Sequence, residues 1–266
     1  MGNSNQGRLR QQIGFLRQQF VQQGDLPFTN VLSQHIVLEA LTAAKITWKD
    51  SIYQPLVALW VFWSQVLSED HSCRAAVARL ITHRLARGQR ACSPETGAYC
   101  TARKRLPEKF FADVTCRTGR ALDAQSRGQW NWKGRHVYMF DGTTVSMPDT
   151  PANQRAYPQP DTQKPELGFP LARIGTITSL ACGAIVKLSF CKYAGKGQSE
   201  VSLLRRMWGI LSPGDVLLTD CLMSTWVEMV MLKQRGVDSV SRLNRARRSA
   251  DFRRGERLGR EDHVVR

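Results

Sequence analysis

Two aspartates stand at the ends of short apolar segments, and their type and spacing could do chemistry. Asp141 follows the apolar run 137–140, and Asp220 follows the run 216–219. If these runs are neighbouring parallel strands, the two carboxylates lie about 4.8 Å apart, where they repel each other unless a cation lies between them. Oxygen ligands suit Mg²⁺ or Mn²⁺. The pair therefore predicts a divalent-metal site; the alternatives are a plain turn residue at Asp141 and a helix cap at Asp220.

The overall charge predicts a polyanionic partner. The chain of 266 residues carries 38 Lys and Arg against 22 Asp and Glu, a formal net charge of +16. Such an excess favours nucleic acid first and an anionic membrane second. The most apolar run, 55–63, is shorter than the about 20 residues that span a bilayer, and the N-terminus has no apolar signal segment. We therefore expect DNA or RNA, and no membrane, as the partner.

The positive charge is concentrated toward both ends of the chain. Residues 1–135 carry a net +10, residues 136–240 a net +1 and residues 241–266 a net +5. A solvated, arginine-rich surface is the alternative to a nucleic-acid footprint. The arginines that we expect to contact DNA are Arg173, Arg242, Arg245, Arg247, Arg248, Arg253 and Arg254.

The elements that must position the two aspartates follow from periodicity. Residues 1–130 read as an all-helical, basic domain for DNA binding or assembly, with helical spacing in 31–44, 52–67 and 73–85, a helix start at Ser93-Pro94 and another helix over 108–124. Residues 131–266 read as a mixed α/β core. Its expected order is strand, strand, strand, helix, strand, helix, strand, which is the connectivity of a ribonuclease-H-like core, incomplete at its C-terminal end.

More detailed expectations concern the second region. The first strand, 136–140, is expected to end at Asp141-Gly142, and the proline-rich stretch 148–170 is expected to be an irregular loop. A hairpin over 174–193 turns at Cys182-Gly183. Helices capped by Ser199 and Ser224 flank the strand 216–219, and a last strand covers 237–243.

The residues around the acids form linked blocks. The first runs Asp141-Gly-Thr-Thr-Val-Ser-Met-Pro-Asp-Thr and continues with Tyr157-Pro158, Gly168-Phe169-Pro170 and Ala172-Arg173. The second runs Gly214-Asp215-Val-Leu-Leu-Thr-Asp220, followed by Gly236-Val237-Asp238 and Arg242-Leu243. Together they resemble the catalytic blocks of DDE transposases of bacterial insertion sequences, in the insertion-sequence-four branch. The resemblance covers roughly residues 90–266.

The resemblance implies an enzyme of DNA transposition and recombination with a ribonuclease-H-like fold. Such enzymes cut and join DNA at element ends by metal-dependent phosphodiester hydrolysis and strand transfer, with three acids holding two Mg²⁺ or Mn²⁺ ions. It implies Asp141 as the first acid and Asp220 as the second. It also implies double-stranded DNA, as terminal repeats and target, for the partner, and a homodimer on paired DNA ends.

Two departures from the family affect the expected activity. Cys221 stands where the family has Arg, and the family's glutamate has no counterpart before Arg266. We therefore expect no third catalytic acid in this chain, which would be the front part of a transposase with little or no cleavage activity alone. The alternative is a non-catalytic regulator that binds DNA ends. Seven scattered cysteines without C-x-x-C spacing predict reduced thiols and a cytoplasmic protein. The resemblance implies that it is a bacterial, nucleoid-associated protein.

Overall fold

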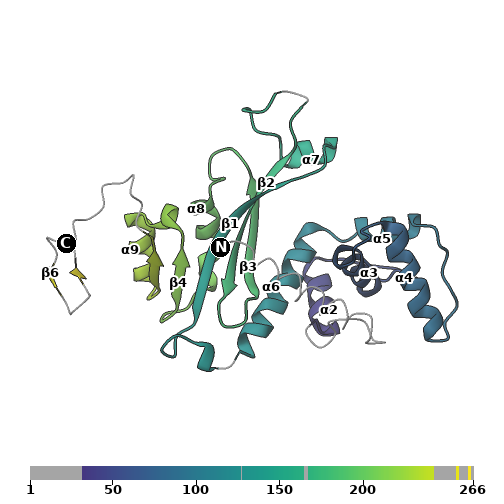
Figure 1. The fold of residues 1–266 in the computed structure, drawn as a ribbon, viewed down its shortest axis with the longest axis horizontal. Coiled ribbons are helices and arrows are strands. Elements are labelled where there is room, and N and C mark those ends of the chain that lie inside the picture. The colour runs from purple at the N-terminus through teal and green to yellow at the C-terminus, as the bar shows by residue number, and fades with distance from the viewer. Residues whose placement is uncertain (1–31, 127, 165–166, 243–255, 258–262, 265–266) are drawn as a thin grey trace, which may run out of the picture. The chain divides into compact units, whose positions relative to one another are not determined.

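The computed structural model describes residues 32–126, 128–164, 167–242, 256–257 and 263–264 (Figure 1). The chain divides into two compact units, Met1–Thr118 and Gly119–Arg266. The division falls inside one continuous helix, α6 (Glu108–Ala124), ahead of the expected boundary between residues 130 and 131. None of the described helices is both long enough and apolar enough to cross a bilayer.

The described elements of the first unit are helices. They are α2 (Gln34–Ala43), α3 (Pro55–Leu67), α4 (Cys73–Ala86), α5 (Gly97–Lys104) and the first part of α6. Serine side chains begin two of them, because the Ser33 hydroxyl accepts a hydrogen bond from the Ile36 amide and the Ser72 hydroxyl accepts one from the Ala75 amide. The helices expected over 31–44, 52–67 and 73–85 are present with small shifts of their ends.

Helix α3 explains the most apolar run of the sequence. Leu59 lies in one buried cluster with Phe110, and Val61 lies in a second buried cluster with Val77. All four side chains are fully buried. A helix that packs on two sides needs apolar residues around most of its surface, so the run is a core helix.

The expected helix start at Ser93-Pro94 is wrong. Helix α5 begins four residues later, at Gly97, with Thr96 before it. The Ser93 hydroxyl instead accepts a hydrogen bond from the Glu95 amide at 3.2 Å. This local bond closes a short turn, which competes with the helix for the same amide.

The second unit contains a mixed five-stranded sheet. Its strands are β1 (Val137–Ser146), β2 (Leu171–Ser179), β3 (Ile185–Lys192), β4 (Val216–Thr219) and β5 (Asp238–Ser241), in the order β3-β2-β1-β4-β5. β1, β2 and β3 pair antiparallel, whereas β4 is parallel to β1 and β5 is parallel to β4. Gly183, with φ of 71°, lies in the turn between β2 and β3 as expected.

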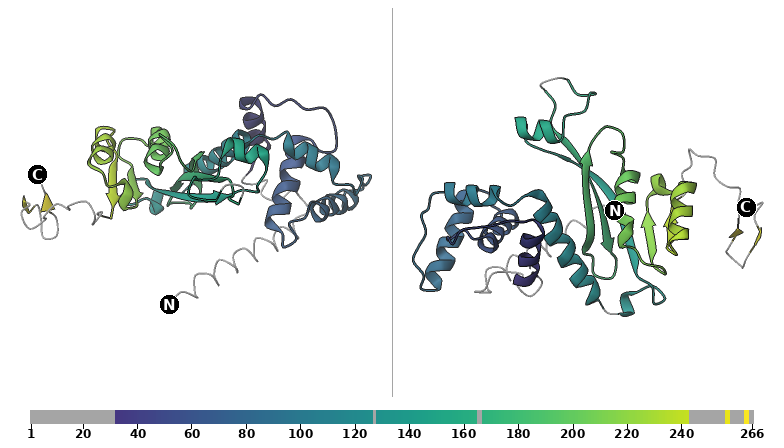
Figure 2. Two further views of the ribbon diagram at one scale, coloured as in Figure 1. Left: turned by 90° about the horizontal axis from the view of Figure 1, so that it is seen from above. Right: turned by 180° about the vertical axis from the view of Figure 1, so that it is seen from behind.

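Two helices cover the same face of this sheet. They are α8 (Glu200–Met207) and α9 (Trp226–Gln234), and Figure 2 shows both on one side of the strands. Leu203 of α8 and Leu232 of α9 join Phe140 and Leu217 of the strands in one buried cluster. The even-numbered residue Phe140 on β1 and the odd-numbered Leu217 on β4 therefore face the helices.

Several boundaries in the second unit differ from expectation. β1 does not end at Asp141-Gly142 but continues to Ser146, because residues 142–146 pair with residues 171–175 of β2. The stretch 148–170 is not wholly irregular: it contains α7 (Pro151–Ala156), begun by Pro151 and by the Thr150 hydroxyl, which accepts from the Asn153 amide.

The ends and caps of the later elements differ in detail. α8 is capped by Ser199, as expected, but ends at Met207 and passes into a 3₁₀ turn, η2 (Trp208–Ile210). α9 is capped by Thr225 and not by Ser224. β5 ends at Ser241, and residue 243 lies outside the described part. The remaining described elements are η1 (Gly128–Trp130), η3 (Cys221–Met223), β6 (Glu256–Arg257) and β7 (His263–Val264).

Candidate functional site

The pairing of β1 with β4 brings the two aspartates to neighbouring positions. The register aligns Met139 with Leu218. Asp141 and Asp220 each follow these partners by two residues, so both lie where the two parallel strands run out at the same edge. Paired strands are about 4.8 Å apart, and the register of β1 with β4 ends at Met139 and Leu218, two residues before each acid.

Both aspartates belong to the sheet face that α8 and α9 do not cover. Side chains alternate between the two faces along a strand, and Phe140 and Leu217 point toward the helices. Asp141, next to Phe140, therefore belongs to the opposite face. Asp220, three positions beyond Leu217, belongs to that same opposite face. Both residues are exposed to solvent.

Each aspartate uses one carboxylate oxygen for the local backbone. Asp141 Oδ1 accepts from the Gly142 amide at 2.8 Å, and Asp220 Oδ1 accepts from the Leu222 amide at 3.0 Å. Asp220 thereby caps the 3₁₀ turn η3, which is the cap role that the sequence left open. The Oδ2 atom of each residue receives no hydrogen bond from any residue that the structure describes, so one oxygen from each remains to bind a ligand.

This donor set fits a hard divalent cation. Two exposed carboxylates on adjacent strands offer two oxygens on one face, and Mg²⁺ is commonly bound by one or two carboxylates together with water and phosphate oxygens. Among the described residues, no group of three His, Cys, Asp or Glu side chains is placed to hold a metal ion. The two acids could therefore hold such an ion only with ligands from outside this set.

Gly142, the residue after Asp141, allows the Glu200 side chain to lie close to β1 on the helix-covered face. A Cβ atom at Gly142 would lie 2.9 Å from Cγ of Glu200, so the missing side chain makes room for this glutamate. Glu200 Oε1 lies 3.4 Å from Arg173 Nη1 in an ion pair. No motif in the sequence indicated this neighbourhood, because Glu200 lies in α8, far from Gly142 along the chain.

Arg173 also belongs to the helix-covered face of the sheet, where neighbouring residues hold it in place. It pairs in register with Thr144, which is even-numbered like Phe140. Its Nε atom donates to the Tyr193 carbonyl at 3.1 Å, and its guanidinium lies 4.7 Å from the centre of the Tyr193 ring. The structure thus places this predicted DNA contact opposite the two aspartates and gives it partners within the protein.

Arg242 lies beside Cys221, the residue that follows the second aspartate. It is exposed at the end of β5, and its Nη2 atom is 4.0 Å from the Cys221 sulfur. Cys221 is the position where the resemblance led us to expect an arginine. The guanidinium of Arg242, which follows the neighbouring strand β5, therefore lies next to Cys221, where the family has an arginine. The other arginines predicted to bind DNA, at 245, 247, 248, 253 and 254, lie outside the described residues.

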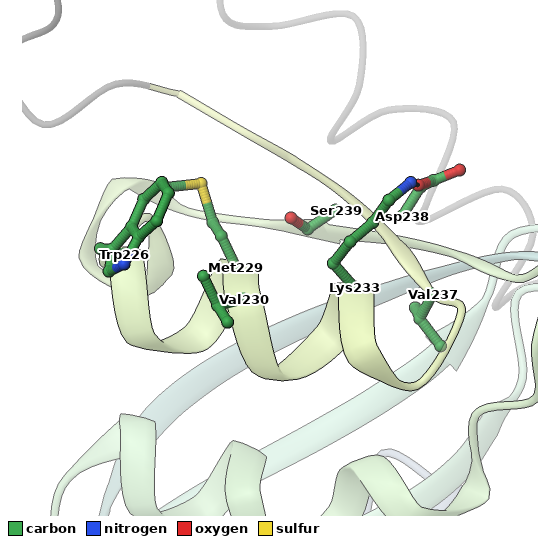
Figure 3. A pocket seen from close by; sticks show the side chains of 7 residues that line it. All are labelled: Trp226, Met229, Val230, Lys233, Val237, Asp238 and Ser239. Atoms are coloured by element: carbon green, nitrogen blue, oxygen red, sulfur yellow. Dashed lines mark hydrogen bonds and ion pairs between the residues drawn. The ribbon is translucent and has the colours of Figure 1, made fainter. Parts of the chain in front are cut away.

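A cavity of about 490 Å³ opens between α9 and β5 (Figure 3). Trp226 and Met229 lie at one end of its lining, and Lys233 and Asp238 lie at the other, with 3.0 Å between Nζ and Oδ1. Asp238 begins β5, whereas Asp220 follows the end of the parallel strand β4. Neither aspartate of the pair lines this cavity.

A second group of acidic residues lies where β1 and β4 begin. Asp215 is 7% exposed, and burial raises the pKa of its carboxyl group. Asp238 shows the opposite behaviour, since hydrogen bonds from Lys233 and Arg135 lower the pKa of its carboxyl group. Asp123 of α6 accepts hydrogen bonds from the Ser179 and Tyr138 hydroxyls. These contacts fix the sheet and lie at the end away from the aspartate pair.

The comparisons with known proteins add no relative. No protein-family model matches the chain, and no curated protein matches it.

Proposed function

We propose that this chain is a DNA-binding protein of the DDE transposase type that acts at the ends of an insertion sequence. The observation that carries the proposal is the parallel pairing of β1 with β4, from which we infer that Asp141 and Asp220 share one exposed face at the same edge of the sheet. The net charge of +16 and the linked sequence blocks support it. The order of strands and helices, β1-β2-β3-α8-β4-α9-β5, supports a ribonuclease-H-like core.

In this proposal the site residues have separate roles. Asp141 and Asp220 hold Mg²⁺ or Mn²⁺ through their Oδ2 atoms. Such an ion supplies Lewis-acid activation at a phosphodiester when it is bound. Arg242, next to Cys221, attracts the DNA phosphate toward the aspartates. A homodimer on paired DNA ends and a cytoplasmic, nucleoid-associated location belong to the same proposal.

DNA recognition is tested with duplexes drawn from the DNA on either side of the reading frame, because the proposal places the element ends outside it. We expect these duplexes to bind more tightly than scrambled duplexes of equal length and composition. The binding constant should fall steeply with salt, since phosphate contacts release counterions. Equal binding to flanking and scrambled duplexes would overturn the proposed recognition of element ends.

A non-catalytic DNA-end binder is the second candidate. The observation that favours it is that each aspartate already has a local structural role, Asp141 toward Gly142 and Asp220 as the cap of η3. Both candidates predict end binding that survives the substitution Asp141→Asn. They differ in nicking of the bound duplex with Mg²⁺: residual nicking that Asp141→Asn abolishes identifies the enzyme, and nicking at the same level in both proteins excludes Asp141 as its source.

A further inference from the structure

Two half-buried cysteines of the first unit lie in contact although they are far apart in sequence. The sulfur atoms of Cys73 and Cys100 are 3.8 Å apart. Cys73 is the first residue of α4, and Cys100 lies in the middle of α5. A disulfide bond requires about 2.05 Å between the sulfurs, so modest side-chain rotations would close the remaining gap.

Cys73 lies at the start of a helix, and its sulfur accepts hydrogen bonds from its neighbours. It is the first residue of a helix of 14 residues whose cap is Ser72, and the Cys100 thiol donates to its sulfur. Gln65 Nε2 lies 3.6 Å from the Cys73 sulfur and donates to it. Gln65 is itself fixed, because its Oε1 atom accepts hydrogen bonds from Tyr99 and Arg103 of α5.

Cys100 is a thiol that is harder to ionise than a free cysteine. Burial and the neighbouring Cys73 thiol raise the pKa of the Cys100 thiol. Because the thiolate is the form that attacks a disulfide, a thiol with a raised pKa is poorly suited to the first attack and better suited to resolving the mixed disulfide. The arrangement therefore assigns the first attack to Cys73.

We propose that Cys73 and Cys100 form a reversible disulfide when the protein meets a small-molecule disulfide such as oxidised glutathione. The Cys73 thiolate attacks one sulfur of oxidised glutathione and releases one glutathione. The Cys100 thiolate then attacks the Cys73 sulfur of the mixed disulfide and releases the second glutathione. The protein loses two electrons and two thiol protons, which leave on the two glutathione molecules.

The bond would tie the start of α4 to α5. It closes a loop whose ends are 27 positions apart, and cross-linking such a loop restricts the unfolded chain. The oxidised protein should therefore melt about 5 °C or more above the reduced protein. A reductant such as dithiothreitol should return the melting temperature to its starting value.

The test treats the full-length reduced protein with oxidised glutathione and follows its intact mass and its peptides. We expect a product that has lost two hydrogens, carries no glutathione, and yields a cross-linked peptide joining Cys73 and Cys100. The count of free thiols should fall from the seven of the sequence to five. Stable glutathione adducts on these cysteines, or unchanged thiols, would overturn the proposal.

Variants separate the pair from general thiol oxidation. In Cys100→Ser the mixed disulfide on Cys73 should persist, because nothing resolves it. Cys182→Ser is the matched control, since Cys182 is exposed and belongs to the other unit, and it should form the bridge at the wild-type rate. A bridge involving Cys182 in place of the pair would contradict the assignment. Circular dichroism of the reduced variants verifies that they are folded.

Discussion

Asp141 and Asp220 follow the register partners Met139 and Leu218 by the same number of residues on two adjacent parallel strands. The equal offset matters because a difference of one residue would send the two side chains to opposite faces of the sheet. Only the matched positions allow both carboxylates to contact one ion. This relationship leads to the first prediction.

Removal of either negative charge should weaken metal binding. We expect Asp141→Asn and Asp220→Asn each to reduce Mn²⁺ affinity at least about tenfold, because a hard cation loses one of two anionic ligands. Asparagine keeps an acceptor oxygen for the Gly142 or Leu222 amide, so the local fold should survive. Free Mn²⁺ is measured by electron paramagnetic resonance. Asp161→Asn, at an exposed position, should bind Mn²⁺ like the wild type; equal affinity in all four proteins would refute the site.

Loss of the charge next to Cys221 should weaken DNA binding. We expect Arg242→Gln to lower the affinity for duplex DNA at low salt, and to reduce the slope of log affinity against log salt by about 0.9 for one lost phosphate contact. Fluorescence anisotropy across a salt series measures both quantities. Lys196→Gln removes one exposed charge from the loop after β3 and is the control. A slope that changes as much in the control as in Arg242→Gln would count against a specific contact.

Close backbone packing should make Gly119 sensitive to substitution. A Cβ atom there would lie 1.8 Å from the Ile185 carbonyl oxygen. Alanine favours a helix over glycine by about 1 kcal/mol, but this overlap forces the backbone to move, so we expect Gly119→Ala to destabilise the protein by about 1–3 kcal/mol. Urea denaturation measures the change. Gly209→Ala has no neighbour within 4 Å of its Cβ and should change stability by less than about 0.5 kcal/mol.

The two acids where β4 and β5 begin should respond to pH with opposite signs. Burial raises the folded-state pKa of Asp215, so the folded protein loses stability as pH rises through that pKa. We expect Asp215→Asn, which can still accept from the Ser212 amide, to be more stable than the wild type at pH 7, and the gain to shrink as pH falls.

Asp238 supplies the contrasting case. Its folded-state pKa is lowered, chiefly by hydrogen bonds from Lys233 and Arg135, so its contribution to stability is present at neutral pH and is lost as pH falls through that pKa. Asp238→Asn should therefore destabilise the protein at pH 7, and the loss should shrink in acid. Urea titrations between pH 3 and about pH 7 compare the two variants, and the same sign for both would contradict this account.

Local patterns predicted most elements of the second unit. Alternating apolar residues placed β2 and β3, the run before Asp220 placed β4 at 216–219, and Ser199 marked the start of α8. These signals succeeded because each depends on residues that are close in sequence. The aspartate pair could be suspected for the same reason, since both acids follow apolar strands.

The sequence could not predict features that depend on distant partners. β1 continues past Asp141 because β2 pairs with it, and the Asp-Gly dipeptide alone indicates a turn. The approach of Glu200 to Gly142, and of Arg242 to Cys221, likewise requires the assembled sheet. Helix α5 was mispredicted for a local reason. The residues at Ser93-Pro94 are typical of a helix start, but the Ser93 hydroxyl accepts from the Glu95 amide in a short turn, and the helix begins later.

Because β1 continues beyond Asp141, the backbone is more firmly held at Asp141 than at Asp220. Asp141 is anchored within a long strand, opposite Thr176 of β2, whereas Asp220 stands at the junction between a short strand and the 3₁₀ turn η3. Any adjustment of the distance between the acids is therefore expected to come from the turn at 220–223. In the proposed site Asp141 is therefore the fixed ligand and Asp220 the movable one, so that ions of different size would be accommodated by a shift at residues 220–223 alone.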